Sequence, residues 1–299
     1  MRADPTYYNT VVQALNNSMR NSNDLAAELS SGLRVGSLSD DPTAATQSLR
    51  LDQMIASIDT YVSTASGVSS QLQSVDSALG EVVTQLTSAI SLAVSAANGT
   101  LNGSNEQSIA QQVESVRDTV LSLANSSYQG VYLFAGSKGD TQPFTLDTST
   151  TPATVNYAGD SNVRTLVTPG GQKIQTSLPG TTIFGSGSTG VLGVLNQLVD
   201  DLTSGAPASN VEADSSALTD ALNTVSSQRS LLNNSLSTIK STSTYAQTQE
   251  AQLKVQQGSL VSSDPAAVAT DLKANETQYQ ALLSVITALQ QTNLFDHLQ

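Results

Sequence analysis

The 299-residue chain is poor in charge: 12% of its residues are charged, 38% are hydrophobic, and the formal net charge is −13. The acidic balance argues against a nucleic acid or an anionic membrane as partner, because no basic surface is available to neutralise phosphates. The chain has no cysteine, which excludes disulfides, thiolate metal ligands and a cysteine nucleophile. So little apolar material predicts narrow stripes along helices rather than a thick core.

The sequence predicts neither membrane insertion nor a cleavable export signal. No stretch approaches the roughly 20 consecutive apolar residues of a membrane span. The N-terminal segment MRADPTYYNTVVQALNNS has one arginine but lacks the continuous apolar core of a secretory signal. If the protein is exported, we expect another route to read it.

The first helix is expected to end at the glycines Gly32 and Gly36. Apolar residues recur at alternating steps of three and four, and the one polar member of this stripe is Ser22. The stripe comprises Val12, Leu15, Met19, Ser22, Ala26, Leu29 and Leu33.

A second, longer helix is expected from Pro42 to Ala97. Its apolar stripe is interrupted by Ser69 and Asp76. At 1.5 Å per residue such a helix would be about 84 Å long, which predicts an elongated rod. A third helix is expected to begin at a capping box formed by Ser104 and Gln107.

The second half of the chain predicts another long helix and a terminal one. In the long helix apolar residues recur at strict seven-residue spacing, which is typical of coiled-coil-like packing. Arg229 and Gln257 are among the polar residues that interrupt its second seam, so a bundle is favoured over a tight dimer. The stripes are Leu218, Val225, Leu232, Ile239, Ala246, Leu253 and Leu260, and then Val268, Leu272, Asn275, Tyr279, Leu282, Ile286 and Leu289.

Between residues 131 and 189 the pattern changes to short β-prone runs such as GVYLFAGSK, PFTL and VRTLVTPGG, separated by turn residues. GSGSTG at 185–190 is interpreted as a flexible exit. The predicted fold class is therefore mainly α with a small β domain inserted between helices 3 and 4, in an elongated bundle of long antiparallel helices. Three parts are expected: terminal helices at 1–40 plus 261–299, a helical rod at 41–130 plus 190–260, and the insert at 131–189.

No set of residues predicts catalysis, a metal or a cofactor. The single histidine, His297, lies near the end of the chain, where a fixed pocket is rare. No G-x-S-x-G elbow surrounds a serine, and no glycine-rich tract has the lysine of a phosphate-binding loop. AGDSN and SKGD lack the spacing of a calcium loop and are interpreted as turns. The chain is not expected to be an enzyme.

The adjacent Asp40 and Asp41 could hold a metal, run acid–base chemistry or start a helix. The helix start is favoured, because Asp41 is a preferred N-cap residue and Pro42 is a preferred first helical residue. Asp40 would then add a second negative charge at the positive end of the helix dipole. The same Asp-Pro pattern recurs at Asp264 and Pro265, where the last helix is expected to begin.

The run LAAELSSGLRVGSLSDDPTAA resembles the flagellin superfamily, in which a helix, an SSG-x-R turn and a second long helix open the chain. SDDP, the segment ANSSYQGVYLFAGSK and the run VNYAGDSNVRTLV followed by SLPGTTIFG are more specifically similar to the hook–filament junction branch. The ending LQQTNLFDHLQ is similar to that branch as well. The resemblance covers nearly the whole chain.

This resemblance implies a non-enzymatic axial protein of the bacterial flagellum that joins hook to filament as a ring of copies. It implies outward-facing β domains, an adjacent hook-associated protein and flagellin as neighbours, and an export chaperone at the C-terminal region. It also implies an extracellular location after unfolded type III export. By the matching positions, contacts between copies are expected at Val12, Leu15, Met19, Leu29, Leu282, Ile286 and Leu289, and the turn would join the inner helix to the rod.

Two alternatives remain open at this point. The first is flagellin, the filament subunit, although a single modest β insert is small for many flagellins. The second is an enzyme or lectin-like β domain on a helical stalk, with acids such as Asp140, Asp147 and Asp160 in its site. Sugar-binding surfaces usually need Trp or Tyr platforms, and the aromatic content disfavours this alternative: the chain has no tryptophan, and the insert has few tyrosines beyond Tyr132 and Tyr157.

Overall fold

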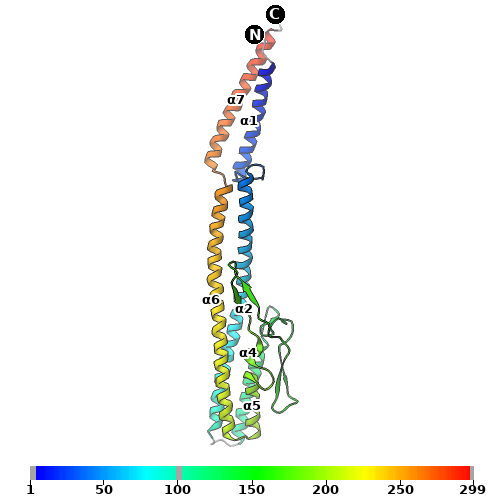
Figure 1. Ribbon diagram of the computed structural model, residues 1–299, viewed down its shortest axis with the longest axis vertical. Helices are drawn as coiled ribbons and strands as arrows, with labels where there is room; N and C mark the ends of the chain where they lie inside the picture. Colours follow the sequence, from blue (N-terminus) through cyan, green and yellow to red (C-terminus); the bar gives the residue numbers. More distant parts are fainter. Residues whose placement is uncertain (1–4, 99–102, 297–299) are drawn as a thin grey trace. The chain divides into compact units, whose positions relative to one another are not determined.

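The computed structural model describes residues 5–98 and 103–296, and most of these residues are helical. The long helices are α1 (Pro5–Ser31), α2 (Pro42–Ala97), α3 (Gly103–Ala124), α5 (Gly190–Ser204), α6 (Ala208–Val261) and α7 (Pro265–Asp296). A short helix, α4 (Gly180–Phe184), precedes α5 (Figure 1). The chain forms two compact units, residues 57–248 and residues 1–56 with 249–299. The predicted mainly α fold with a small β insert is confirmed.

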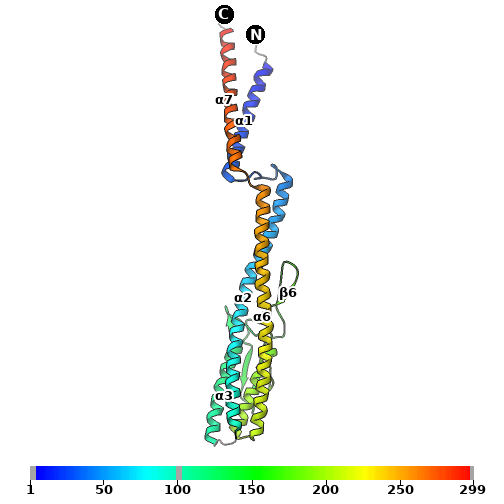
Figure 2. The same cartoon turned by 90° about the vertical axis from the view of Figure 1, so that its left-hand side faces the viewer.

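In the unit of residues 57–248, α2 and α6 run antiparallel (Figures 1 and 2). The hydroxyls of Tyr61 and Thr242 are hydrogen-bonded at 2.6 Å. Farther along, Arg229 Nε donates to Asp76 Oδ1 at 2.7 Å. Hydrogen bonding by the Arg229 side chain is the main cause that holds the pKa of the Asp76 carboxyl below its usual value. The pairing joins two residues that interrupt the apolar stripes of their helices. The seven-residue seam of α6 in this unit is buried at Leu218, Val225, Leu232, Ile239 and Ala246.

Burial on α2 is broader than the predicted stripe. Ala78, Val82 and Ala89 are buried in addition to the predicted Leu79 and Leu86. In this unit α3 and α5 pack against each other beside the α2–α6 pair. The helix therefore meets neighbours on more than one face, which a single stripe does not describe.

One 18-residue window of α2 is long and apolar enough to cross a membrane, by length and composition alone, with a mean hydropathy of 1.3. No such segment was predicted from the sequence. A helix in the core of a bundle passes the same test, because its apolar face is continuous. Leu72, Leu79 and Leu86 of α2 are fully buried within this unit.

The insert contains three separate antiparallel strand pairs rather than one sheet. They are β1 (Ser127–Tyr128) with β2 (Val131–Tyr132), β3 (Phe144–Asp147) with β4 (Thr154–Tyr157), and β5 (Thr165–Val167) with β6 (Lys173–Gln175). A cluster of aromatic rings joins the β3–β4 pair to Phe134 and to α4. The ring centroid of Phe134 lies 5.1 Å from that of Phe184, which lies 5.4 Å from that of Phe144.

The segment after the insert differs from the expectation in two ways. GSGSTG is not a free exit, because the amide of Gly187 donates to Val155 O at 2.7 Å and Val155 returns a bond. Helix α5 then begins at Gly190, so α4 and α5 are added to the predicted order of helices. Gly205, in the left-handed conformation, ends α5.

The turns at 136–138 and 158–162 are joined by one carboxylate. Asp160 Oδ1 accepts hydrogen bonds from the amides of Ser137 and Asn162 at 2.8 and 3.0 Å, and Oδ2 accepts one from the Ser137 hydroxyl. Donation by Ser137, first from its hydroxyl and then from its amide, lowers the pKa of Asp160 to about 2. Gly136 has φ +69, and a Cβ there would collide with Asp160. From the sequence alone, the segments SKGD and AGDSN are expected to be two independent turns.

Two carboxyl groups are buried together between α5 and α6. Asp201 is 8% exposed and Asp214 is 7% exposed. Burial, followed by repulsion from Asp201, raises the pKa of Asp214 to about 7. Gln197 Nε2 donates to Asp201 Oδ1 at 3.2 Å. Asp214 therefore keeps its proton at pH values where an exposed aspartate is ionised.

We expect Asp214→Asn to raise the melting temperature more at about pH 8 than at about pH 4. The folded chain holds the Asp214 proton up to about pH 7, whereas the unfolded chain releases it near 3.8. The folded state therefore loses stability as pH rises through this interval, and asparagine removes that loss. Circular dichroism melts measure the difference, with Asp220→Asn on the exposed surface of α6 as control. An equal shift at both pH values would contradict the buried acid pair.

Candidate assembly site

The N-terminal and C-terminal helices form an antiparallel pair (Figures 1 and 2). Ser18 of α1 lies opposite Asn275 of α7, and both are only 6% exposed. Val11 and Val268 are the buried apolar residues of this pair. The remaining seam is half-buried, so the pair is held by a narrow interface. Its half-buried apolar residues include Val12, Leu15, Leu25, Leu272, Tyr279, Leu282 and Ile286.

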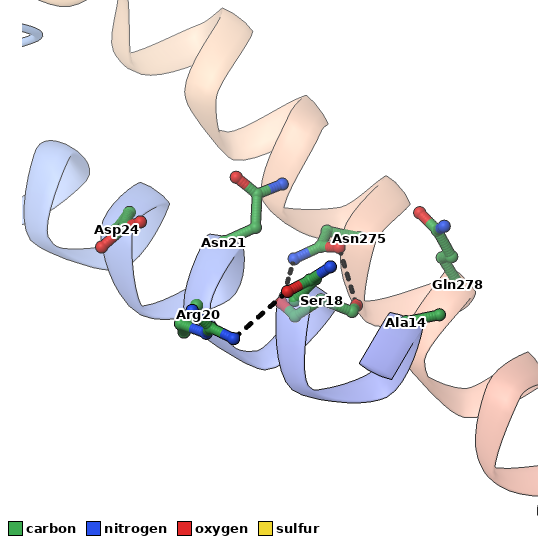
Figure 3. Close-up of a pocket in the computed structure, with 8 residues that line it drawn as sticks. Ala14, Ser18, Arg20, Asn21, Asp24, Asn275 and Gln278 are labelled. Carbon is green, nitrogen blue, oxygen red and sulfur yellow. Dashed lines mark hydrogen bonds between the residues drawn. The ribbon is translucent and has the colours of Figure 1, made fainter. Parts of the chain in front are cut away.

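The centre of the interface is polar (Figure 3). Asn275 Nδ2 donates to Ser18 O and to Ser22 Oγ, each at 2.8 Å. Asn275 Oδ1 accepts a hydrogen bond from Ser18 Oγ, also at 2.8 Å. Every hydrogen-bonding atom of the buried amide thus has at least one partner, which avoids the penalty of an unsatisfied polar group. We call Ser18, Ser22 and Asn275 the polar lock.

A groove of about 630 Å³ opens beside the polar lock (Figure 3). Ala14 is its only apolar lining side chain in the described part of the chain. Arg20 Nη2 donates to Asn17 Oδ1 at 3.3 Å across one turn of α1. The other lining residues are Ser18, Asn21, Asp24, Asn275 and Gln278.

A joint connects this helix pair to the start of α2 and the end of α6. Gly32 (φ +70) ends α1, and its amide donates to Glu28 O at 2.8 Å. Beyond it, Arg34 N donates to Val261 O at 2.8 Å, and Ser263 N donates to Gly32 O at 3.0 Å. The two connecting segments are therefore tied together by an antiparallel backbone bridge.

Two side chains reinforce the joint. Arg34 Nη2 donates to Leu260 O at 2.9 Å, and the same guanidinium lies 3.6 Å from Asp41 Oδ2. Gln257 Nε2 donates to Ser48 Oγ at 3.2 Å and to Asp52 Oδ1 at 2.6 Å, joining the end of α6 to the start of α2. The long-range contacts fix which residues of the two connectors face each other.

Asp41 forms an N-cap, since its Oδ1 accepts from the amides of Thr43 at 3.1 Å and Ala44 at 3.0 Å. Donation by the Ala44 amide is the main cause that lowers the pKa of Asp41. At the start of α7, Asp264 Oδ1 accepts from Ala266 N at 2.9 Å, with Pro265 as the first helical residue.

Asp40 has backbone partners that the sequence did not predict. Its Oδ2 accepts from the amides of Gly36 at 3.0 Å and Ser37 at 2.8 Å, which closes the turn before Asp41. The Ser37 hydroxyl is the largest contribution to its lowered pKa. Gly36 lies inside this turn and does not end α1; Gly32 alone does so. Sequence spacing did not separate the two carboxylates, because both precede the same proline.

The expected contact residues fall into two groups. Met19 is 45% exposed and Leu29 is 40% exposed, so both side chains remain available for contacts with other molecules. Val12, Leu15, Leu282 and Ile286 are half-buried. The side chain of Leu289 and the whole of His297 lie outside the described residues. Sequence reasoning missed three other exposed apolar residues of the pair, Tyr7, Leu283 and Val285.

Among the described residues no group of three or more His, Cys, Asp or Glu side chains could hold a metal ion. Two of the three acids proposed for a site in the insert, Asp147 and Asp160, have structural partners. Asp147 Oδ1 accepts from the Ser149 amide at 2.9 Å and from its hydroxyl, and Asp160 joins two turns.

Comparison with known proteins connects these features. The N-terminal helical region of bacterial flagellin matches residues 6–139, and the C-terminal helical region of bacterial flagellin matches residues 216–298. The chain belongs to the flagellin family. The two matched regions contain α1–α3 and most of α6 with α7, and strands β3–β6 with α4 and α5 lie between them.

Relatives within the family match along the full length. Flagellar hook-associated protein 3 of Salmonella typhimurium is 28% identical, and that of Escherichia coli is 26% identical, each over 96% of both chains. The predicted resemblance to this branch of the flagellin family is confirmed.

Solved structures share the fold. A protein described as a flagellar hook-associated protein from Vibrio parahaemolyticus aligns with a TM-score of 0.66 at 23% identity, over 75% of this chain and 100% of that chain. FlgL from Xanthomonas campestris aligns with a TM-score of 0.62 at 17% identity, over 70% of this chain and 99% of that chain.

We expect Asp40→Ala and Asp41→Ala to expose different amides to hydrogen exchange. Asp40→Ala should speed exchange at Gly36 and Ser37, whereas Asp41→Ala should speed it at Ala44. Site-resolved exchange by NMR measures both effects. Asp41→Asn is the matched control, because asparagine retains an N-cap acceptor. Faster exchange at Ala44 in Asp40→Ala would show that Asp40 acts on the helix after all.

Proposed function

We propose that this chain is a structural axial protein of the bacterial flagellum that joins the hook to the filament. The observation that carries the proposal is the similarity to flagellar hook-associated protein 3 from end to end, including the insert that separates the two flagellin regions. Copies of the chain form a ring, and each contacts an adjacent hook-associated protein on one side and flagellin on the other. The chain has no catalytic role in this function.

Contacts between copies are made by the exposed apolar residues of the terminal helix pair. Met19 and Leu29 are the expected contact residues that the pairing of α1 with α7 leaves exposed. Leu283 and Val285 of α7, at 39% and 36% exposure, extend this set. Leu15, Leu282 and Ile286 act mainly within the pair, and Val12 and Leu289 complete the proposed contact set.

The parts of the chain divide this work. Residues 1–40 and 261–299 form the inner, assembling part, residues 41–130 and 190–260 form the helical rod, and residues 131–189 form an outward-facing domain. The joint of residues 32–41 connects the first two parts. Support for this division comes from the backbone bridge of Leu33 with Ser262, which lies just beyond the ends of α1 and α6.

The protein acts outside the cell after export in an unfolded form without a cleavable signal peptide. A chaperone that covers the C-terminal region keeps α7 from associating too early. The complete lack of cysteine suits a chain that is exported unfolded, since no disulfide has to be broken. The half-buried seam of the terminal pair supports a segment that gains burial on assembly.

Deletion of the gene should leave hooks intact, remove filaments and release flagellin monomers into the medium. Electron microscopy of cells and immunoblots of the culture medium measure these outcomes. Normal filaments in the deletion strain would contradict the junction function. If purified wild-type filaments consist of this chain, the protein is flagellin instead.

The variant Met19→Asp with Leu29→Asp should be exported at the normal level but fail to restore motility to the deletion strain. Two charges on the exposed surface of α1 disfavour apolar contacts between copies, while the face toward α7 is unchanged. Swimming assays and immunoblots measure the effect. Val163→Asp is the matched control, because Val163 is 44% exposed and lies in the insert. Full motility of the double variant would contradict the proposed contact surface.

A further inference from the structure

The two terminal helices differ in how well their sequences predict the buried face. On α7 the buried and half-buried residues are those of the predicted stripe, among them Val268, Leu272 and Asn275. On α1 the predicted stripe included Met19, Ala26 and Leu29, yet these three residues are exposed. The inward residues of α1 include Leu15 and Ser22 of that stripe, together with Val11, Ser18 and Leu25, which lie outside it.

This difference amounts to a rotation of α1 about its own axis. With 3.6 residues per turn, the inward face is turned by roughly 60° from the centre of the apolar stripe. The rotation exchanges Met19 for Ser18 and Ala26 for Leu25 on the face toward α7. Burying Leu25 in place of Ala26 offsets the loss of Met19 from the interface, so apolar burial alone does not decide between the two faces.

We propose that Asn275 is a positioning residue that selects the face of α1 turned toward α7. Its amide makes hydrogen bonds to Ser18 O, Ser18 Oγ and Ser22 Oγ, all at 2.8 Å. If α1 turned the centre of its predicted stripe inward, Met19 would approach Asn275 in place of Ser18. A thioether offers no comparable partner, and the buried amide would be left unsatisfied.

The selected face decides which residues remain for other molecules. Because Ser18 faces inward, its neighbour Met19 is kept on the outside of the pair at 45% exposure. The polar lock therefore keeps the apolar side of α1 available by a hydrogen-bonding constraint, in the way that a buried polar residue specifies one arrangement of a coiled coil. That this side meets a second copy rests on the proposed function; the rotation itself does not.

The neighbouring joint does not supply this selection. The backbone bridge between Gly32 and Ser263 fixes the end of α1 relative to the start of α7. It acts through backbone atoms beyond the end of α1 and makes no contact with the side chains that distinguish the two faces. The polar lock lies about three turns away along α1, where the choice between Ser18 and Met19 is made.

The test uses the absence of native cysteine. Single variants Leu25→Cys and Ala26→Cys are prepared in the full chain, with Asn275 and with Asn275→Leu, and maleimide labelling rates are measured. With Asn275, the cysteine at position 26 should react faster than the one at position 25. With Asn275→Leu, the order should reverse, because α1 turns its apolar face inward. Helix content by circular dichroism should be unchanged.

One control and two further outcomes complete the test. Gln278→Leu adds the same apolar side chain at an exposed position of α7 and should leave the labelling order as it is. An unchanged order in Asn275→Leu would overturn the proposal. Fast labelling at both positions in Asn275→Leu would also overturn it, since Asn275 would then hold the pair together without selecting a face.

Swimming of the Asn275→Leu variant in the deletion strain distinguishes failure of this proposal from failure of the proposed function. If the labelling order reverses and Asn275→Leu also fails to support swimming in the deletion strain, both are supported. If the order reverses while swimming is normal, the selected face stands and the use of that face between copies is contradicted.

Discussion

A polar side chain within an apolar helix seam must find a hydrogen-bonding partner, and this constraint aligns the long helices of the chain. Asn275 meets Ser18 and Ser22, Asp76 meets Arg229, and Gln257 meets Ser48 and Asp52. Each set joins the first half of the chain to the second. Stripes of Val, Leu and Ala tolerate sliding and rotation, because one apolar neighbour replaces another at little cost. The polar contacts do not, so they specify one antiparallel arrangement.

The same constraint lets the terminal helices form a defined pair and still keep apolar side chains for assembly. Backbone bonds between residues 32–35 and 260–263 replace helical bonds at the point where both helices are interrupted. Beyond that joint, α1 and α7 share a narrow seam with a polar centre, and apolar side chains remain exposed on both. An arrangement of this kind is stable enough to form a defined pair and still has surface to bury in an assembly. That is what an axial subunit of the flagellin family requires.

Much of the fold follows from the sequence, because helix starts and stripes are local properties. The Asp-Pro starts, the seam from Leu218 to Ala246 and the position of the insert could all be predicted. The face of α1 could not, since the partner of Ser18 is 257 residues away. The bond from Asp40 to Gly36, and the link that Asp160 makes between two turns, depend on loop geometry that residue spacing does not encode. The broad burial on α2 reflects neighbours, α3 and α5, that no single stripe reveals.

Electron cryo-microscopy of the native hook–filament junction tests the central claim most directly. We expect α1 and α7 of the same copy to lie antiparallel, with Asn275 against Ser18, and Met19 and Leu29 to lie at the boundary with a neighbouring copy. A junction in which α1 pairs instead with α7 of another copy, or in which Met19 and Leu29 touch no neighbour, would contradict it.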